Sequence, residues 1–284
     1  MAVTEPILLP QRAPAPQADE VLFVGNATVL LRLAGFTILT DPNFLHAGDT
    51  ARLGGGLRSR RLKPPALSIG DLPPLDLVLL SHHHGDHFDE VAAAQLDHGL
   101  PIVTTSHAAR KLVRQGFDNP LPLRTWESRT FVRDGRQLRI TALPAQHGPA
   151  PVARVLPETM GSLVEVSGEG TAGSGLYVTG DTVIHDALAE IPRRHPRIDC
   201  ALVHLGETRV LGVLLTMDAD QGVELLRITR PRHALPIHVD DYTVQRMRLA
   251  DLTAALDRAE GLATEVHNLP RGRAVALPGS SASS

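Results

Sequence analysis

A histidine-rich segment at residues 81–87, which reads Ser-His-His-His-Gly-Asp-His, constrains this chain more than any other feature of its sequence. It holds four candidate metal ligands of two chemical types, since His82 and His84 are two residues apart and Asp86 and His87 are adjacent. A short loop with this spacing could direct imidazoles and a carboxylate at two neighbouring ions, an arrangement that suits zinc. His83 is not expected to bind metal, because side-chain alternation turns it away from the face of its neighbours.

The residues before these histidines predict where the segment lies in the fold. Residues 76–80 form a short apolar run that follows two prolines, a pattern typical of a buried strand. Ligands at the carboxyl end of such a strand lie where sites in α/β sheets usually form. Four further candidates also follow predicted strands: Asp41 after 36–40, His147 after 137–143, Asp181 after 176–179 and His238 after 233–237. A metal site assembled from several strand ends is therefore predicted.

The order of predicted elements indicates the fold class. Strands are predicted at 21–24, 28–33, 36–40, 101–104, 162–166 and 200–204, and helices at 89–97, 107–115, 184–194, 219–228 and 243–259. Two blocks of strands, each with its own helices, predict an α/β fold in the form of a four-layer α/β/β/α sandwich. We assign this domain to residues 19–277, between a proline-rich arm at 1–18 and a disordered tail at 278–284.

Composition excludes several classes of protein. The chain has 284 residues, 43% of them hydrophobic, which supplies a substantial core. Its formal net charge of −3 gives no general attraction to nucleic acid, and no apolar run approaches the roughly 18 residues that span a membrane. The single cysteine, Cys200, excludes an intrachain disulfide framework and is expected to be a buried apolar residue. A cytoplasmic location is therefore expected.

The candidate ligands occur in an order that resembles the metallo-β-lactamase-fold hydrolases. That order is Thr40-Asp41-Pro42, His82-x-His84-x-Asp86-His87, His147, Asp181 and His238. The resemblance extends over nearly the whole chain, from about residue 20 to 276. Residues 24–28, the long insertion up to residues 72–76 and Gly161-Ser162 look most like the branch of ascorbate-6-phosphate lactonases and N-acyl phosphatidylethanolamine phospholipase D. The fold that this resemblance implies is the same four-layer sandwich.

The resemblance also implies a cofactor and a role for each ligand. It implies two divalent metal ions, zinc in preference to manganese or iron. His82, His84 and His147 would bind one ion, Asp86, His87 and His238 would bind the other, and Asp181 would bridge them. Asp86 is also the expected catalytic proton carrier, while Asp41 is expected to orient a ligand histidine. Di-iron flavoproteins of the superfamily carry glutamate at the position of His84, so hydrolysis is favoured over redox chemistry.

Four residues are candidates for substrate binding. Asn26 stands where the resembled branch commonly has histidine. Arg58 and Arg60 belong to residues 52–63, a glycine-containing segment with five basic residues and no acid. This segment is expected to be a mobile loop that covers the site and attracts an anion, or a plain solvated loop. His204 ends a predicted strand near the expected mouth, where it could touch substrate or serve a structural role.

We therefore expect a hydrolase that uses a two-metal-activated water on a small, anionic ester, lactone or phosphodiester. A nucleic-acid phosphodiesterase is one alternative, against which stand the acidic balance and the lack of an appended RNA-binding region. A non-catalytic metal-binding protein of the same fold is another, against which stands the complete ligand set. The expected partner is a small molecule, and a homo-oligomer is compatible with the sequence.

Overall fold

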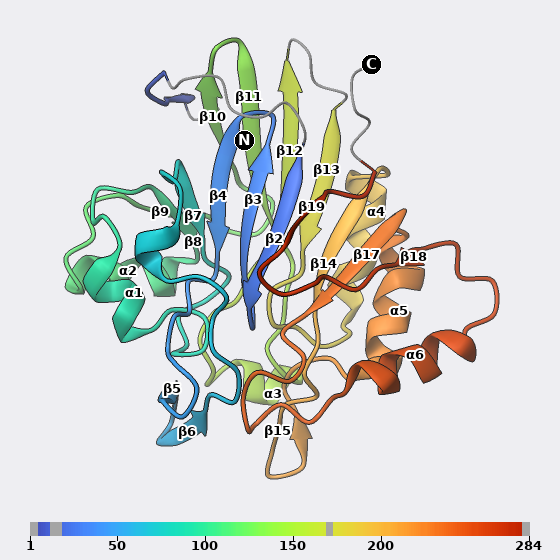
Figure 1. Cartoon of the computed structure of the whole chain (residues 1–284). Helices are drawn as coiled ribbons and strands as arrows, with labels where there is room; N and C mark the ends of the chain where they lie inside the picture. Colours follow the sequence, from blue (N-terminus) through green and yellow to red (C-terminus); the bar gives the residue numbers. More distant parts are fainter. Residues whose placement is uncertain (1–4, 12–18, 169–172, 280–284) are drawn as a thin grey trace.

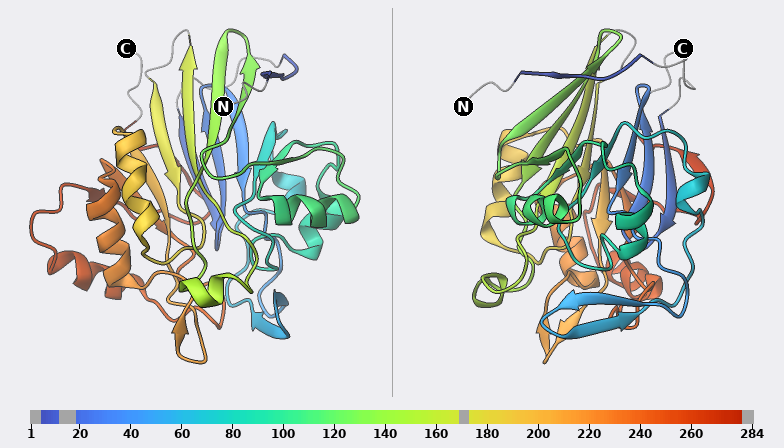
Figure 2. Two further views of the ribbon diagram at one scale, coloured as in Figure 1. Left: turned by 180° about the vertical axis from the view of Figure 1, so that it is seen from behind. Right: turned by 90° about the vertical axis from the view of Figure 1, so that its left-hand side faces the viewer.

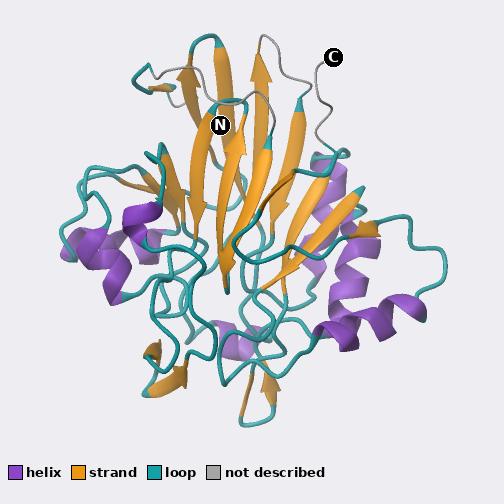
Figure 3. Ribbon diagram, viewed as in Figure 1, coloured by secondary structure: helices purple, strands orange, loops and turns teal. Residues whose placement is uncertain are grey.

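The computed structural model describes residues 5–11, 19–168 and 173–279. Two β-sheets pack face to face in the centre of the molecule, with helices on both flanks (Figures 1 and 3). Helices α1 and α2 lie on one flank, and α4, α5 and α6 lie on the other (Figure 1). This arrangement confirms the four-layer α/β/β/α sandwich expected from the sequence.

The first sheet supplies two of the strand ends that lead to candidate ligands. Within the described residues it runs in the order β19 (Ala274–Ala276), β2 (Glu20–Gly25), β3 (Thr28–Leu33), β4 (Phe36–Thr40), β7 (Leu77–Leu79), β8 (Ile102–Thr104) and β9 (Pro120–Pro122). Pairing is antiparallel from β19 to β4 and parallel from β4 to β9. Because β4 and β7 are parallel, Asp41 and the histidine segment emerge at the same edge of the sheet.

The second sheet supplies the remaining strand ends. In the described ranges its order is β1 (Ile7–Leu8), β10 (Ser128–Arg133), β11 (Arg136–Leu143), β12 (Gly161–Gly168), β13 (Ser174–Val178), β14 (Cys200–His204), β17 (His233–Ile237) and β18 (Glu265–Val266). Strands β13, β14, β17 and β18 are parallel, whereas β10 to β13 pair antiparallel. Two hairpins, β5–β6 (Thr50–Gly54 and Leu57–Arg60) and β15–β16 (Arg209–Val210 and Val213–Leu214), stand apart from both sheets.

Three of the described helices begin at residues whose side chains satisfy a first-turn backbone N–H group. The elements are α1 (Glu90–Gln95), α2 (Ser106–Arg114), α3 (Ala150–Ala153), α4 (Glu190–Arg194), α5 (Ala219–Thr229), α6 (Leu249–Asp257) and 3-10 helices at Ile69–Asp71 and Asp186–Ala189. The side chains of Asp89, Thr105 and Asp218 each accept a hydrogen bond from a first-turn N–H of α1, α2 and α5. Such caps fix where a helix starts.

Side-chain alternation along the strands builds the core. In β3, Leu31 packs between the two sheets while its neighbour Leu30 packs under the helices of its own sheet. In β14, Cys200 and Leu202 face the opposite sheet, and Val203 faces the helical layer. Cys200 is therefore a buried apolar residue, as the sequence predicts.

The last predicted helix is shorter than expected. Helix α6 begins at Leu249, whereas the sequence predicts helix from residue 243. The side-chain oxygen of Gln245 accepts hydrogen bonds from the backbone N–H groups of Asp241 and Tyr242, at 2.7 and 2.9 Å. These bonds hold the preceding residues in an irregular loop, so helix cannot begin there.

The basic segment at residues 52–63 also differs from expectation. Most of it belongs to the β5–β6 hairpin, in which Arg52 pairs with Arg58, so it is not an irregular loop. Arg61 is 1% exposed, and its guanidinium donates to the backbone oxygens of Asn43 and Lys63 at 2.9 and 2.8 Å. The glycine-rich composition of this segment indicates neither its backbone pairing nor the burial of Arg61.

The two predicted terminal segments are only partly described. Within the arm predicted at residues 1–18, β1 pairs in parallel with Phe131 and Val132 of β10. Residues 1–4, 12–18 and 280–284, which include most of the predicted tail, lie outside the described residues. No helix in the described ranges has both the length and the apolar character needed to cross a membrane.

Candidate metal centre

The seven candidate ligands converge where the strands of both sheets end. All seven are buried, and the most exposed of them, His84, is only 7% exposed. Their ligand atoms form three groups, in each of which all atoms lie within 4.8 Å of one another. The groups are His82, His84 and His147; Asp86, His87 and His238; and His82, His87 and Asp181. His83 is in none of them and instead lies 3.0 Å from the side-chain oxygen of Gln115.

The first group contains three imidazoles. His82 Nε2 lies 3.0 Å from His84 Nδ1, and the His147 ring centroid is 5.2 Å from each of the other two. His147 Nδ1 donates a hydrogen bond to the backbone oxygen of Leu215 at 3.0 Å. This bond keeps the ring proton of His147 on Nδ1. The lone pair of Nε2 therefore faces the other two histidines.

The second group combines a carboxylate with two imidazoles. Asp86 Oδ2 lies 3.5 Å from His238 Nε2 and 3.9 Å from His87 Nε2. His238 Nδ1 donates to the backbone oxygen of Leu205 at 2.8 Å. His87 Nδ1 lies 3.1 Å from the carboxylate of Asp41. Both rings therefore direct Nε2 towards Asp86.

Asp181 lies between the two groups. Its Oδ2 is 3.3 Å from His87 Nε2, and it is 4.0 Å from Nε2 of both His82 and His147. Its Oδ1 is 3.6 Å from His238 Nδ1. One carboxylate thus reaches ligands of both groups, which is the geometry that a bridging ligand requires.

Several ligand atoms at the centre lack the partners that burial normally demands. Within the described residues, His87 Nε2, His238 Nε2, Asp86 Oδ1 and Asp181 Oδ1 are buried without a hydrogen-bond partner. Leaving such a group unsatisfied costs about 1–3 kcal/mol, and more when the group is charged. Cations at the two groups would satisfy the two imidazole nitrogens and would neutralise the charge of the two carboxylates. The nitrogen and carboxylate donors fit zinc, and they also accommodate manganese or iron.

Asp41 connects the ligands to the interior of the protein. It accepts hydrogen bonds from the backbone N–H and the hydroxyl of Ser81, at 2.7 and 2.9 Å. His87 Nδ1 and His204 Nε2 lie 3.1 and 3.4 Å from the same carboxylate oxygen. The carboxylate is 1% exposed and faces the rear of the His87 ring. This position supports an orienting role for Asp41.

Electrostatics favour the charge states that bind cations at Asp181 and His84, but not at His87. Burial alone would raise the pKa of Asp181, but the neighbouring His238 and His87 lower it well below its usual range. Burial, reinforced by His147, lowers the pKa of His84 to about 3, so this imidazole is neutral at neutral pH. Burial would lower the pKa of His87, yet Asp181 and Asp86 raise it well above its usual range. A cation at His87 therefore competes with a proton, and binding should release protons.

Residues 36–239 match the family model described as "Beta-lactamase superfamily domain". The chain belongs to the metallo-β-lactamase superfamily.

Individual relatives and solved structures agree with this membership. The N-acyl-phosphatidylethanolamine-hydrolyzing phospholipase D 1 of Caenorhabditis elegans is 28% identical over 231 residues, which cover 78% of this chain and 63% of that relative. A metal-dependent hydrolase of Carboxydothermus hydrogenoformans is 26% identical over 262 residues, which cover 91% of this chain and 100% of that relative. The solved isothiocyanate hydrolase from Delia radicum gut bacteria has a TM-score of 0.74 at 22% identity, covering 91% of this chain and 99% of that one.

The chain therefore spans less than two thirds of the nematode relative but the whole length of the bacterial one. It is a metal-dependent hydrolase of the metallo-β-lactamase superfamily, as the sequence predicts.

Two of the four substrate candidates of this hydrolase are buried. Asn26 is 0% exposed; its amide donates to the backbone oxygen of Asp86 at 2.6 Å and accepts from Gln245 at 2.8 Å. His204 is also 0% exposed, and it lies against Thr179 and Asp41. Both side chains are therefore held by contacts with the residues around the ligands, and their role in substrate binding stays a prediction.

The other two candidates lie on the β5–β6 hairpin. Arg58 and Arg60 are exposed there. The hairpin packs on the ligand loop, because Gly85 N–H donates to the backbone oxygen of Arg52 at 3.0 Å. A Cβ at Gly85 would lie 2.7 Å from backbone atoms of Arg52, so only glycine permits this approach. Figure 2 shows this hairpin at the same end of the sandwich as α3 and the β15–β16 hairpin.

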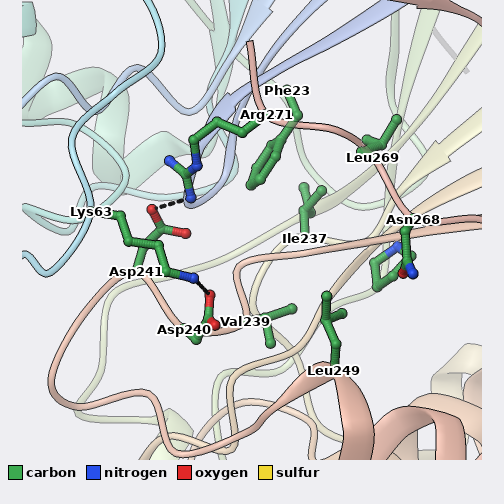
Figure 4. Close-up of a pocket in the computed structure, with 11 residues that line it drawn as sticks. Phe23, Lys63, Ile237, Val239, Asp240, Asp241, Leu249, Asn268, Leu269 and Arg271 are labelled. Carbon is green, nitrogen blue, oxygen red and sulfur yellow. Dashed lines mark hydrogen bonds and ion pairs between the residues drawn. The ribbon is translucent and has the colours of Figure 1, made fainter. Parts of the chain in front are cut away.

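The loop after His238 is held by residues that the sequence did not single out. Arg271 pairs with Asp241 at 2.6 Å (Figure 4). It also donates to the backbone oxygens of Val24 and Pro64. Lys63 pairs with Asp240 beside it. These side chains border a 190 Å³ pocket that Phe23, Leu249 and Leu269 line on its apolar side. No local pattern marks Arg271, because its partners are distant in sequence.

Proposed function

We propose that this hydrolase binds two divalent cations, zinc in the first instance, and hydrolyses a small anionic ester, lactone or phosphodiester. The observation that carries the proposal is the pair of buried three-residue groups with Asp181 within reach of both. When bound, two such cations lower the pKa of a water molecule and polarise the electrophilic oxygen of the substrate. Manganese and iron remain alternatives, because the same donors accommodate them.

Each residue of the centre has a role that its surroundings support. His82, His84 and His147 would hold one cation, Asp86, His87 and His238 would hold the other, and Asp181 would bridge them. Asp86 Oδ1 has no hydrogen-bond partner among the residues that the structure describes, so this atom is free to carry a proton towards the leaving group. Asp41 keeps the proton of His87 on Nδ1 and thereby leaves Nε2 free to bind.

The preference for an anionic substrate rests on the basic hairpin. Arg58 and Arg60 are exposed, and their hairpin packs directly against the ligand loop through Gly85. Exposed positive charge beside a cation site raises the local concentration of anions. The name of the nematode relative denotes hydrolysis of N-acyl-phosphatidylethanolamine, whereas the solved structure described above is an isothiocyanate hydrolase. The fold alone therefore does not choose the substrate.

A substrate screen on protein of measured metal content tests the proposal. The panel contains lactones, phosphodiesters, phosphomonoesters, amides and structured RNA. We expect turnover of an anionic ester, lactone or phosphodiester with two bound cations per chain. His84→Ala should lose metal and turnover, whereas His83→Ala, which alters the adjacent histidine outside the ligand groups, should keep both.

Other outcomes of the same screen point elsewhere. Full turnover in both His84→Ala and Asp86→Ala would contradict the assignment. Cleavage of RNA ahead of every small substrate would favour a nuclease, and bound metal without any turnover would favour a non-catalytic protein.

We also propose a cytoplasmic location, supported by the lone buried thiol of Cys200, which fractionation of the native host would test.

A further inference from the structure

A second group of metal-ligating side chains lies at the edge of the eight-stranded sheet. It consists of His233, Glu265 and His267. In the parallel pairing of β17 with β18, His233 lies opposite Glu265, and His267 follows Glu265 by two residues. Because side chains alternate along an extended chain, Glu265 and His267 project from the same face. Figure 1 shows β17 and β18 together at the outer edge of the sheet, beside the loop that follows α6.

The ligand atoms of this edge group are spaced nearly as a single cation requires. His233 Nδ1 is 3.1 Å from His267 Nε2 and 3.5 Å from Glu265 Oε2, and His267 Nε2 is 3.7 Å from the same oxygen. A tetrahedral zinc ion with bonds of about 2.0–2.2 Å places its ligand atoms about 3.3–3.6 Å apart. Small side-chain rotations therefore suffice to bring all three atoms into coordination.

Backbone hydrogen bonds hold the edge group in place without a cation. The N–H of Glu265 donates to Arg232 at 2.9 Å, and the N–H of His267 donates to Ala234 at 2.9 Å. The side chains of His233, His267 and Glu265 are 21%, 41% and 70% exposed, so an ion can enter from solvent and a water can complete its coordination. His233 begins β17 and His238 follows its end, so roughly 16 Å of strand separates this group from the proposed centre.

We propose that His233, Glu265 and His267 form a separate site for one zinc-like cation, which fastens the edge strand β18 to β17. Two imidazoles and a carboxylate suit zinc, nickel and copper better than magnesium or calcium. Strand β18 pairs with the sheet through only two residues, Glu265 and Val266, so a cation adds a link where backbone pairing is short. Residues 258–264, which precede β18, should become better protected from proteases.

The proposal is tested by titrating zinc into protein whose central site already holds zinc, with a chromogenic zinc chelator as competitor. We expect the wild type to bind one zinc equivalent beyond those of the central site. His267→Ala and Glu265→Gln should each bind this equivalent at least tenfold more weakly, while their central metal content stays unchanged. His46→Ala, which removes a lone exposed histidine, is the matched control and should bind like the wild type.

Limited proteolysis provides a second readout that mere surface adsorption would not change. Zinc should slow cleavage within residues 258–264 in the wild type and in His46→Ala, but not in His267→Ala. The proposal is overturned if the wild type binds no more zinc than His267→Ala, or if His46→Ala loses as much zinc as the cluster variants. Because Glu265→Gln keeps the size and the exposed position of its side chain, folding defects in a histidine variant would not hide the result.

Discussion

Replacing Asp41 by asparagine should weaken binding of the cation assigned to Asp86, His87 and His238. In the wild type, Asp41 Oδ1 accepts from the backbone N–H of Ser81 at 2.7 Å, and Oδ2 lies 3.1 Å from His87 Nδ1. An asparagine that keeps the bond to Ser81 places its NH₂ group against His87 Nδ1. Nδ1 must then accept, so the ring proton moves to Nε2, the atom that would bind the cation.

The size of the effect follows from the contacts of this carboxylate. Partners that orient a ligand histidine contribute about 10- to 100-fold to metal affinity, or about 1.4–2.7 kcal/mol. We expect the upper end of this range, because Asp41 is 1% exposed and contacts His204 and Ser81 as well as His87. Water cannot replace the lost charge in so enclosed a position.

Competition against a metal chelator, with metal content measured after equilibration, gives the affinity of each cation. Asp89→Asn is the matched control, because Asp89 is also buried but accepts from the backbone of Leu45 and Ala92 and, within the described residues, forms no hydrogen bond or ion pair with a histidine. The control should lose stability and keep its metal affinity. If Asp41→Asn binds both cations within twofold of the wild type, the orienting role is refuted.

Three further outcomes follow from the structure. Gly85→Ala should destabilise the fold by about 1–3 kcal/mol in urea unfolding, since the new methyl would lie 2.7 Å from the Arg52 backbone; an unchanged midpoint would contradict the close packing. Arg133→Met should cost about 3–5 kcal/mol in thermal unfolding, because it removes the buried guanidinium that pairs with the carboxylate of Asp76, which is 1% exposed; adding Asp76→Asn should recover much of this loss. Burial raises the pKa of Cys200 to about 12, so at pH 8 only about one thiol in 10⁴ is ionised, and iodoacetamide should label it only after unfolding; rapid labelling of the native protein would exclude this burial.

Local sequence was sufficient to predict the fold class and the candidate ligands. The core strands are short apolar runs that end at polar residues, as in β3 and β14, and such runs are typical of strands buried on both faces. His82, His84, Asp86 and His87 fall within six residues, so their joint presence on one loop is a property of the chain itself. The identity and spacing of the residues carry this information, because the four ligands lie within a stretch of chain that is shorter than one structural element.

Only the tertiary structure decided how these residues are held and what surrounds them. Asn26 and Gln245 form a buried hydrogen bond across 219 positions, and it is this contact that turns Asn26 into a support for the ligand loop. His204, expected near the mouth, packs behind the centre against Asp41. The edge group of His233 and His267 likewise depends on pairing between segments 34 residues apart. Burial and hydrogen bonding between distant segments are set by how sheets and loops pack, which no local pattern records.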